Sequence, residues 1–91
     1  MSVRILISSS LMRAPKGMEV KVQASNLMEA LRALVEEYSD ELSGRLFEHD
    51  GSPRRLLNFY VNGKNVRFLQ GFETLLRDGD EVSILPSVSG G

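Results

Sequence analysis

The chain has 91 residues, which is enough for one domain, and its 42% hydrophobic and 25% charged residues are typical of an ordinary globular protein. Its 11 basic and 12 acidic residues give a formal net charge of −1, so charge gives no reason to expect nucleic acid or a membrane surface as the main partner. The absence of cysteine excludes a disulfide framework, a thiolate zinc site and a cysteine nucleophile.

The N-terminal part of the chain predicts a β-hairpin. Apolar residues alternate at Val3, Ile5 and Ile7, which predicts a strand with one buried face. Residues 9–17 contain a proline and a glycine and predict a turn. A second alternation over residues 18–22 predicts the returning strand, so the first two elements are β.

The middle of the chain predicts one amphipathic helix. Apolar residues recur there at spacings of three and four, at Leu27, Ala30, Leu31, Leu34, Val35 and Tyr38. Asn26 occupies the N-cap position, and Glu29 follows it by three residues, close to a capping-box arrangement. Residues 43–53 are polar and contain two glycines, which predicts a long surface connection with, at most, a further helical turn around Leu46.

The C-terminal part of the chain predicts three further strands. Alternation over residues 57–61 predicts the first of them, and Asn62-Gly63 predicts a tight hairpin turn into a short returning strand at 66–68. Residues 71–79 predict a helical turn, and residues 82–85 predict the last strand. The resulting order is β, β, α, β, β, β.

This order predicts an α+β fold of the β-grasp type, in which one main helix packs across a mixed sheet. We expect residues 1–86 to form the domain and residues 87–91 to form a flexible C-terminal tail. No N-terminal stretch combines basic residues with a long apolar run, and no segment approaches membrane-spanning length. A cytoplasmic location is therefore the default expectation.

The two glycines at the end of the sequence are the strongest indication of function. Glycine has no Cβ and accepts almost any backbone angle, so Gly90 and Gly91 can be threaded through a narrow passage into another enzyme's active site. The carboxylate of Gly91 would then be the reactive group. We expect no catalytic residue and no metal site in this chain.

Period-two alternation also predicts a docking surface on the sheet. Inward-pointing residues are expected at Phe59, Val61, Val82 and Ile84, which leaves Tyr60 and Leu85 on the face opposite the helix. We expect these two residues to form an exposed apolar patch, with Val88 as a further member and Arg67 as a contact at its rim.

Four segments carry a resemblance to a known family: Asn58-Phe59-Tyr60-Val61-Asn62, Val66-Arg67-Phe68, Asp78-Gly79-Asp80-Glu81-Val82 and Ile84-Leu85-Pro86-Ser87-Val88-Ser89-Gly90-Gly91. Through them the sequence resembles the ubiquitin-like sulfur carrier family, the group that includes the ThiS and MoaD proteins. Within that family it is most similar to the CysO type, whose members work with a cysteine synthase. The similarity of arrangement covers most of the chain.

The resemblance implies that this chain is a carrier and a substrate, not an enzyme. A ubiquitin-activating-type adenylyltransferase/sulfurtransferase would join the Gly91 carboxylate to AMP from ATP, and a sulfur donor would convert it to a thiocarboxylate. In the CysO type, the sulfur passes to an aminoacrylate on a pyridoxal-phosphate-dependent cysteine synthase, and a metalloprotease releases the cysteine left on the carrier. This chain would itself bind no cofactor.

Three other functions stay open at the level of the sequence. The same chemistry serves molybdopterin, thiazole or tRNA thiolation, because the partner enzyme determines the recipient of the sulfur. A lysine amine could instead capture the activated Gly91, which would make the chain a ubiquitin-like protein modifier. The chain could also be a noncovalent β-grasp interaction module whose tail has no chemistry.

Overall fold

The computed structural model describes residues 1–9, 11 and 17–86, without the side chains of residues 38–42. The predicted tail and most of the predicted turn at 9–17 lie outside these described residues. Within them the chain forms β1 (Ser2–Ile7), β2 (Met18–Gln23), α1 (Leu27–Leu46), β3 (Leu57–Val61), β4 (Lys64–Asn65), the 3-10 helices η1 (Val66–Phe68) and η2 (Gly71–Glu73), and β5 (Glu81–Pro86).

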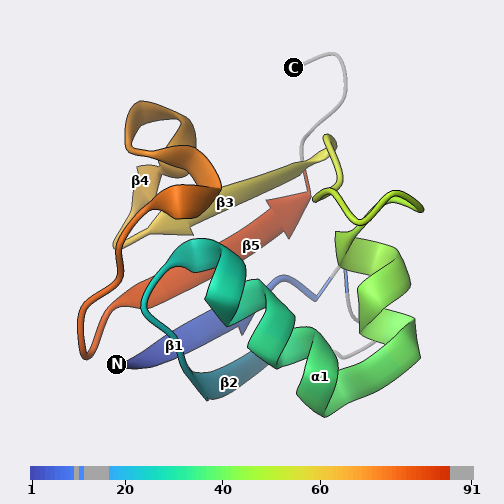
Figure 1. Cartoon of the computed structure of the whole chain (residues 1–91), viewed down its shortest axis with the longest axis horizontal. Helices are drawn as coiled ribbons and strands as arrows, with labels where there is room; N and C mark the ends of the chain where they lie inside the picture. Colours follow the sequence, from blue (N-terminus) through green and yellow to red (C-terminus); the bar gives the residue numbers. More distant parts are fainter. Residues whose placement is uncertain (10, 12–16, 87–91) are drawn as a thin grey trace.

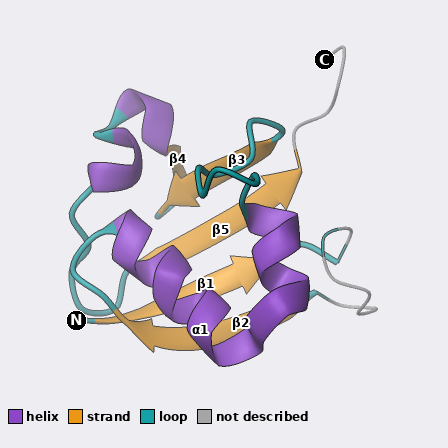
Figure 2. Cartoon of the chain, turned by 45° about the vertical axis from the view of Figure 1, so that its right-hand side comes forward, coloured by secondary structure: helices purple, strands orange, loops and turns teal. Residues whose placement is uncertain are grey.

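The described strands form one mixed sheet in the order β2-β1-β5-β3-β4. β1 pairs antiparallel with β2 and parallel with β5, while β3 pairs antiparallel with both β5 and β4. The helix α1 packs across one face of this sheet (Figures 1 and 2). The predicted β-grasp arrangement is therefore confirmed, with the last strand at the centre of the sheet.

The core lies between α1 and the sheet. The strand residues predicted to point inward are all buried, and Val3, Ile5, Val82 and Ile84 are among those with no exposed surface. From the helix, Leu27, Ala30, Leu31 and Leu34 meet them and are equally inaccessible. Burying a large apolar side chain contributes about 1.5–3 kcal/mol, so this double layer accounts for much of the stability of a small domain.

The helix begins where the sequence predicts and ends later. Asn26 accepts a hydrogen bond from the Glu29 N–H at 2.8 Å, and the Glu29 carboxylate accepts one from the Ser25 N–H at 2.9 Å. The prediction that residues 43–53 form a surface connection is wrong for its first part, since α1 continues to Leu46, which is fully buried. Burial of Leu46 outweighs the helix penalty of about 1 kcal/mol for a glycine at position 44.

The predicted returning strand at 66–68 is also misplaced. Asn62 and Gly63 have positive φ angles of 52° and 85°, as a tight hairpin turn requires, and β4 then occupies only Lys64–Asn65. The Asn65 side chain accepts a hydrogen bond from the Arg67 N–H at 2.9 Å, which starts η1 and turns Val66 into the core. The hairpin ends early because this cap competes with strand pairing.

Candidate functional site

The end of β5 is the part of the described structure that leads to the two glycines. β5 lies between β1 and β3, and its last residue, Pro86, pairs with Leu57 of β3. The chain is thus held in the sheet up to position 86. Val88, Gly90 and Gly91, three of the predicted functional residues, lie outside the described residues.

The sheet face opposite α1 carries the predicted apolar patch. Leu85 is 41% exposed, and Tyr60 is partly exposed on the neighbouring strand. Strand pairing places Tyr60 beside Ser83, and Ser83 beside Leu6 of β1. Leu6 is also partly exposed, so Leu6, Tyr60 and Leu85 surround Ser83; we call these three residues the sheet patch.

Leu6 is the member of the sheet patch that the sequence analysis did not single out. The signal was present, because the inward alternation of Val3, Ile5 and Ile7 places the intervening leucine on the opposite face. An apolar residue on a face otherwise occupied by charged and polar side chains is a candidate for a contact surface. The sheet patch therefore spans three adjacent strands and not two.

The other end of the same face is charged and internally paired. Arg4 lies 3.7 Å from the Glu19 carboxylate and 3.4 Å from the Glu81 carboxylate. These side chains are substantially exposed, so each pair adds little stability. Arg4 and Glu81 form a charge-paired end of the face near the start of β5, whereas Glu19 pairs in register with Leu6 and so borders the sheet patch on its β2 side.

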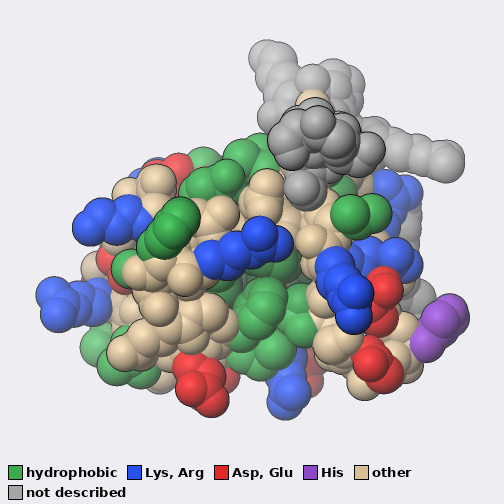
Figure 3. All heavy atoms as spheres, turned by 90° about the horizontal axis from the view of Figure 1, so that it is seen from above, with side chains coloured by type: hydrophobic (Ala, Val, Ile, Leu, Met, Phe, Trp, Pro, Cys, Tyr) green, Lys and Arg blue, Asp and Glu red, His purple; other side chains and the backbone are tan. Residues whose placement is uncertain are grey.

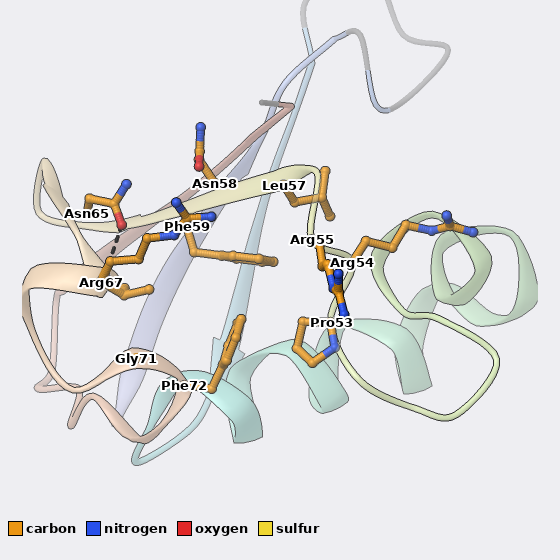
Figure 4. Close-up of a pocket in the computed structure, with 11 residues that line it drawn as sticks. Pro53, Arg54, Arg55, Leu57, Asn58, Phe59, Asn65, Arg67, Gly71 and Phe72 are labelled. Atoms are coloured by element: carbon orange, nitrogen blue, oxygen red, sulfur yellow. Dashed lines mark hydrogen bonds between the residues drawn. The ribbon is translucent and has the colours of Figure 1, made fainter. Parts of the chain in front are cut away.

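Arg67, predicted to contact the rim of the patch, lies in η1. It follows β4 and lines a cavity of about 190 Å³ together with Phe59 and Phe72 (Figure 4). Phe59 points to the side of the sheet that α1 covers, whereas Tyr60 points away from it. Asn65, which accepts the hydrogen bond from the Arg67 N–H, is the residue that pairs with Tyr60, and a contact of Arg67 at the rim of the sheet patch stays a prediction.

Asp50 lies in a local structural contact within the loop after α1. The hydroxyl and N–H of Ser52 donate hydrogen bonds to Asp50, which lower the pKa of that carboxyl. Within the described part of the chain, no group of three or more histidine, cysteine or acidic residues could hold a metal ion. None of the helices described there is long and apolar enough to cross a membrane.

The chain is similar to known proteins over most or all of its length. A sequence model of the ThiS family matches residues 10–91. The sulfur carrier protein CysO of Mycobacterium tuberculosis is 36% identical over 96 residues, covering 100% of both chains. Small archaeal modifier protein 3 of Haloferax volcanii is 48% identical over 63 residues, which cover 69% of this chain and 66% of that protein.

Solved structures agree with these relatives. Small archaeal modifier protein 1 of Methanosarcina acetivorans superposes with a TM-score of 0.84 at 32% identity, covering 99% of this chain and 96% of that one. A chain of the Amycolatopsis orientalis BexX/CysO complex superposes with a TM-score of 0.79 at 30% identity, covering 98% of this chain and 99% of that one. Both the predicted family and the ubiquitin-like fold are thereby confirmed.

Proposed function

Because this chain belongs to the ThiS family, a family of small ubiquitin-like carriers and modifiers that are not themselves enzymes, we propose that it carries sulfur for cysteine biosynthesis as a thiocarboxylate on Gly91. The general role of a sulfur carrier of the ThiS/MoaD/CysO type, without regard to the recipient of the sulfur, follows from the family and from the full-length CysO relative. The assignment to cysteine biosynthesis is supported by the same CysO relative. The structural observation that supports the carrier role is the apolar sheet patch beside Pro86, because it offers partners a surface next to the segment that ends in Gly91.

The proposed chemistry begins with activation of the terminal carboxyl group. Such a group has a reference pKa of about 3.3–3.7, so at neutral pH it is an anion and a poor electrophile. Attack of a Gly91 carboxylate oxygen on the α-phosphorus of ATP would expel pyrophosphate and give an acyl adenylate. Attack of a sulfide sulfur on the acyl carbon would then expel AMP and leave the thiocarboxylate. An adenylyltransferase/sulfurtransferase would supply the active site for both steps.

Transfer and release would take place on two further partners. A pyridoxal-phosphate-dependent cysteine synthase would present the carbon acceptor for the sulfur, and a metalloprotease would cleave the new cysteine from the carrier. ATP and pyridoxal phosphate thus belong to the partners and not to this chain. Use of both cofactors is compatible with a cytoplasmic location, which is part of the proposal.

In this proposal, the described residues provide the surface on which partner proteins dock. A partner that binds the tail must also approach the end of β5, where Leu85 and Tyr60 are exposed on the open face. Apolar contacts of this kind can account for much of the affinity of an interface, since a few central residues usually dominate. The charge-paired end of the face, around Arg4, would form the polar surroundings.

The test is the intact mass of the protein ending at Gly91 after incubation with ATP, sulfide and the activating enzyme of its own cell. We expect a mass gain that matches replacement of one oxygen by sulfur, and no gain for a variant lacking Gly90 and Gly91. Addition of the cysteine synthase and its aminoacrylate precursor should then give a cysteine adduct on Gly91. If the thiocarboxylate forms but the cysteine adduct does not, the chain is a sulfur carrier that serves a different recipient.

Docking is tested separately by Tyr60→Lys and Leu85→Lys, with Gln23→Lys as the matched control. Gln23 is exposed on the same face but lies on the edge strand β2, so the control adds the same charge away from the sheet patch. We expect each patch variant to weaken binding of the activating enzyme about tenfold, the usual effect of losing a central contact. Equal effects of all three variants, or unfolding of the patch variants, would refute the docking assignment.

Protein modification is the second candidate function. It is favoured by the similarity to two small archaeal modifier proteins. Modifier protein 3 of Haloferax volcanii is 48% identical over the matched residues, and modifier protein 1 of Methanosarcina acetivorans superposes with a TM-score of 0.84. In that function a lysine amine attacks the activated Gly91 and forms an amide bond. Mass spectrometry of cell lysates would then find Gly91 joined to lysines of other proteins, and those adducts would be absent after removal of the two glycines.

A further inference from the structure

The cavity beside β3 lies at a strand edge that β4 covers only in part and where the Leu57 N–H donates a hydrogen bond to the Arg54 carbonyl at 3.3 Å. β4 pairs only with Tyr60 and Val61, so within the described residues no strand covers the Leu57–Phe59 part of β3 on that side. The cavity of about 190 Å³ opens at this edge, and its floor is apolar. Phe59 and Phe72 form that floor with an edge-to-face contact, their ring centroids 5.1 Å apart at an angle of 77°.

The backbone of Phe59 is directed toward this edge. Asn62 donates its N–H to the Glu81 carbonyl of β5 at 2.8 Å, and backbone groups alternate in direction along a strand. The N–H and C=O of Asn58 and Tyr60 therefore point to β5, and those of Phe59 point to the cavity. An edge with such groups can pair with a strand of another protein.

The rim of the cavity is basic. Its lining includes Arg54, Arg55 and Arg67 and contains no acidic residue, although the whole chain has a formal net charge of −1. Arg54 already pairs with Glu48 at 3.2 Å, whereas Arg55 and Arg67 have no ion pair within the described residues. Figure 4 shows Arg67 on one side of the two phenylalanine rings and Arg55 on the other, and in Figure 3 basic side chains flank an apolar surface on this side of the molecule.

We propose that this edge binds an extended acidic segment of a partner protein by strand addition. The segment pairs with the backbone of Phe59 and places one apolar side chain on the floor formed by Phe59 and Phe72. In the bound segment, the side chains two positions before and after that apolar residue point in the same direction, toward Arg55 and Arg67. Because both are arginines, carboxylates are favoured at these two positions of the segment. The apolar floor between the arginines distinguishes this site from one for a free phosphate or a nucleic acid backbone.

The proposal is tested with a blocked peptide, acetyl-Glu-Glu-Val-Leu-Val-Glu-Glu-amide, added to the full chain and followed by amide NMR shifts. The central leucine and the glutamates two positions away lie on one side of an extended chain. We expect saturable shifts at Arg55, Leu57, Phe59 and Arg67, together with slower hydrogen exchange of the Phe59 amide. Two matched peptides, one with lysine for every glutamate and one with Gly-Ser-Gly at the centre, should bind at least about tenfold more weakly.

Variants of the protein separate charge at this site from charge in general. Arg55→Glu and Arg67→Glu should each weaken peptide binding about tenfold, while Lys21→Glu makes the same charge change on the exposed side of β2 and should not. Amide spectra of the free variants establish that each one folds. The proposal is overturned if the peptide causes no saturable shifts, if the shifts fall on the sheet patch, or if inorganic phosphate or an oligonucleotide at equal ionic strength shifts the same amides as strongly.

Discussion

The turn before β5 is joined to the β3–β4 hairpin by one carboxylate, and its neutralisation should weaken the domain in a pH-dependent way. Asp80 accepts hydrogen bonds from the Arg77 N–H at 2.8 Å and from the Asn62 side-chain amide at 3.0 Å. The Arg77 N–H, followed by the Asn62 amide, lowers the pKa of Asp80 from 3.8, while desolvation opposes the shift. The substitution Asp80→Asn keeps the shape but places an NH₂ group against one of these donors.

The expected magnitude follows from the loss of one such bond. Hydrogen bonds to charged groups contribute about 1.5–3 kcal/mol, and because Asp80 is only partly buried we expect about 1–2 kcal/mol at neutral pH. For a domain of this size each kcal/mol lowers Tm by about 4–8 °C. A group whose pKa is lowered on folding stabilises fully above its unfolded value, here 3.8, and loses that contribution as the pH falls through the folded value. The difference between wild type and Asp80→Asn should therefore shrink as the pH is lowered below 3.8.

The assay is urea unfolding followed by circular dichroism, at neutral pH and in steps below pH 3.8. Glu37→Gln serves as the control, since it removes the same charge from an exposed position on α1 and should change the free energy of unfolding by less than about 0.5 kcal/mol. The reasoning would be refuted if Asp80→Asn were as stable as wild type at neutral pH. It would also be refuted if the difference in their free energies of unfolding stayed constant into the acid range.

Two further pairs of substitutions test the core and a backbone contact. Leu34→Ala empties a fully buried position and should cost about 2–5 kcal/mol in urea unfolding, whereas Leu75→Ala, at a position 71% exposed, should cost less than about 0.5 kcal/mol. Gly17→Ala should lower the free energy of unfolding more than Gly63→Ala. Both glycines have a positive φ, at which any other residue costs about 1–2 kcal/mol. Only at Gly17 would the added Cβ also lie 2.5 Å from a carbonyl oxygen, that of Ile7. Equal losses from the two glycine variants would contradict the close approach of position 17 to the Ile7 carbonyl.

The sequence predicted the sheet and the main helix because their signals are local. Alternation of period two and apolar spacing of three and four depend only on near neighbours, and the cap at Asn26 is contained in four residues. The errors lie where a distant contact determines the outcome. Leu46 extends the helix because it reaches the core, and Val66, which the Asn65 cap turns inward, is buried in the same core.

The same distinction applies to the candidate sites. Tyr60 and Leu85 were assignable to the open face because alternation within one strand gives the direction of each side chain. That Leu6 completes the sheet patch depends on the register of β1 against β5, which sequence alone does not supply. The cavity was out of reach, because its lining, which includes Arg67, comes from three separate stretches of chain.

The sheet patch and the basic cavity differ in how they relate to the tail. Leu85 faces the open side of the sheet, whereas Leu57, which pairs with the next residue, Pro86, lines the cavity on the other side. A protein that holds the segment after Pro86 therefore approaches both surfaces, yet a substitution on one leaves the other intact. Sulfur carriage requires successive partners to bind one short tail, and two separable surfaces would allow them to differ. If so, Leu85→Lys and Arg55→Glu should weaken different partners, and weakening of the same partners in the same ratio would mean that both surfaces belong to one interface.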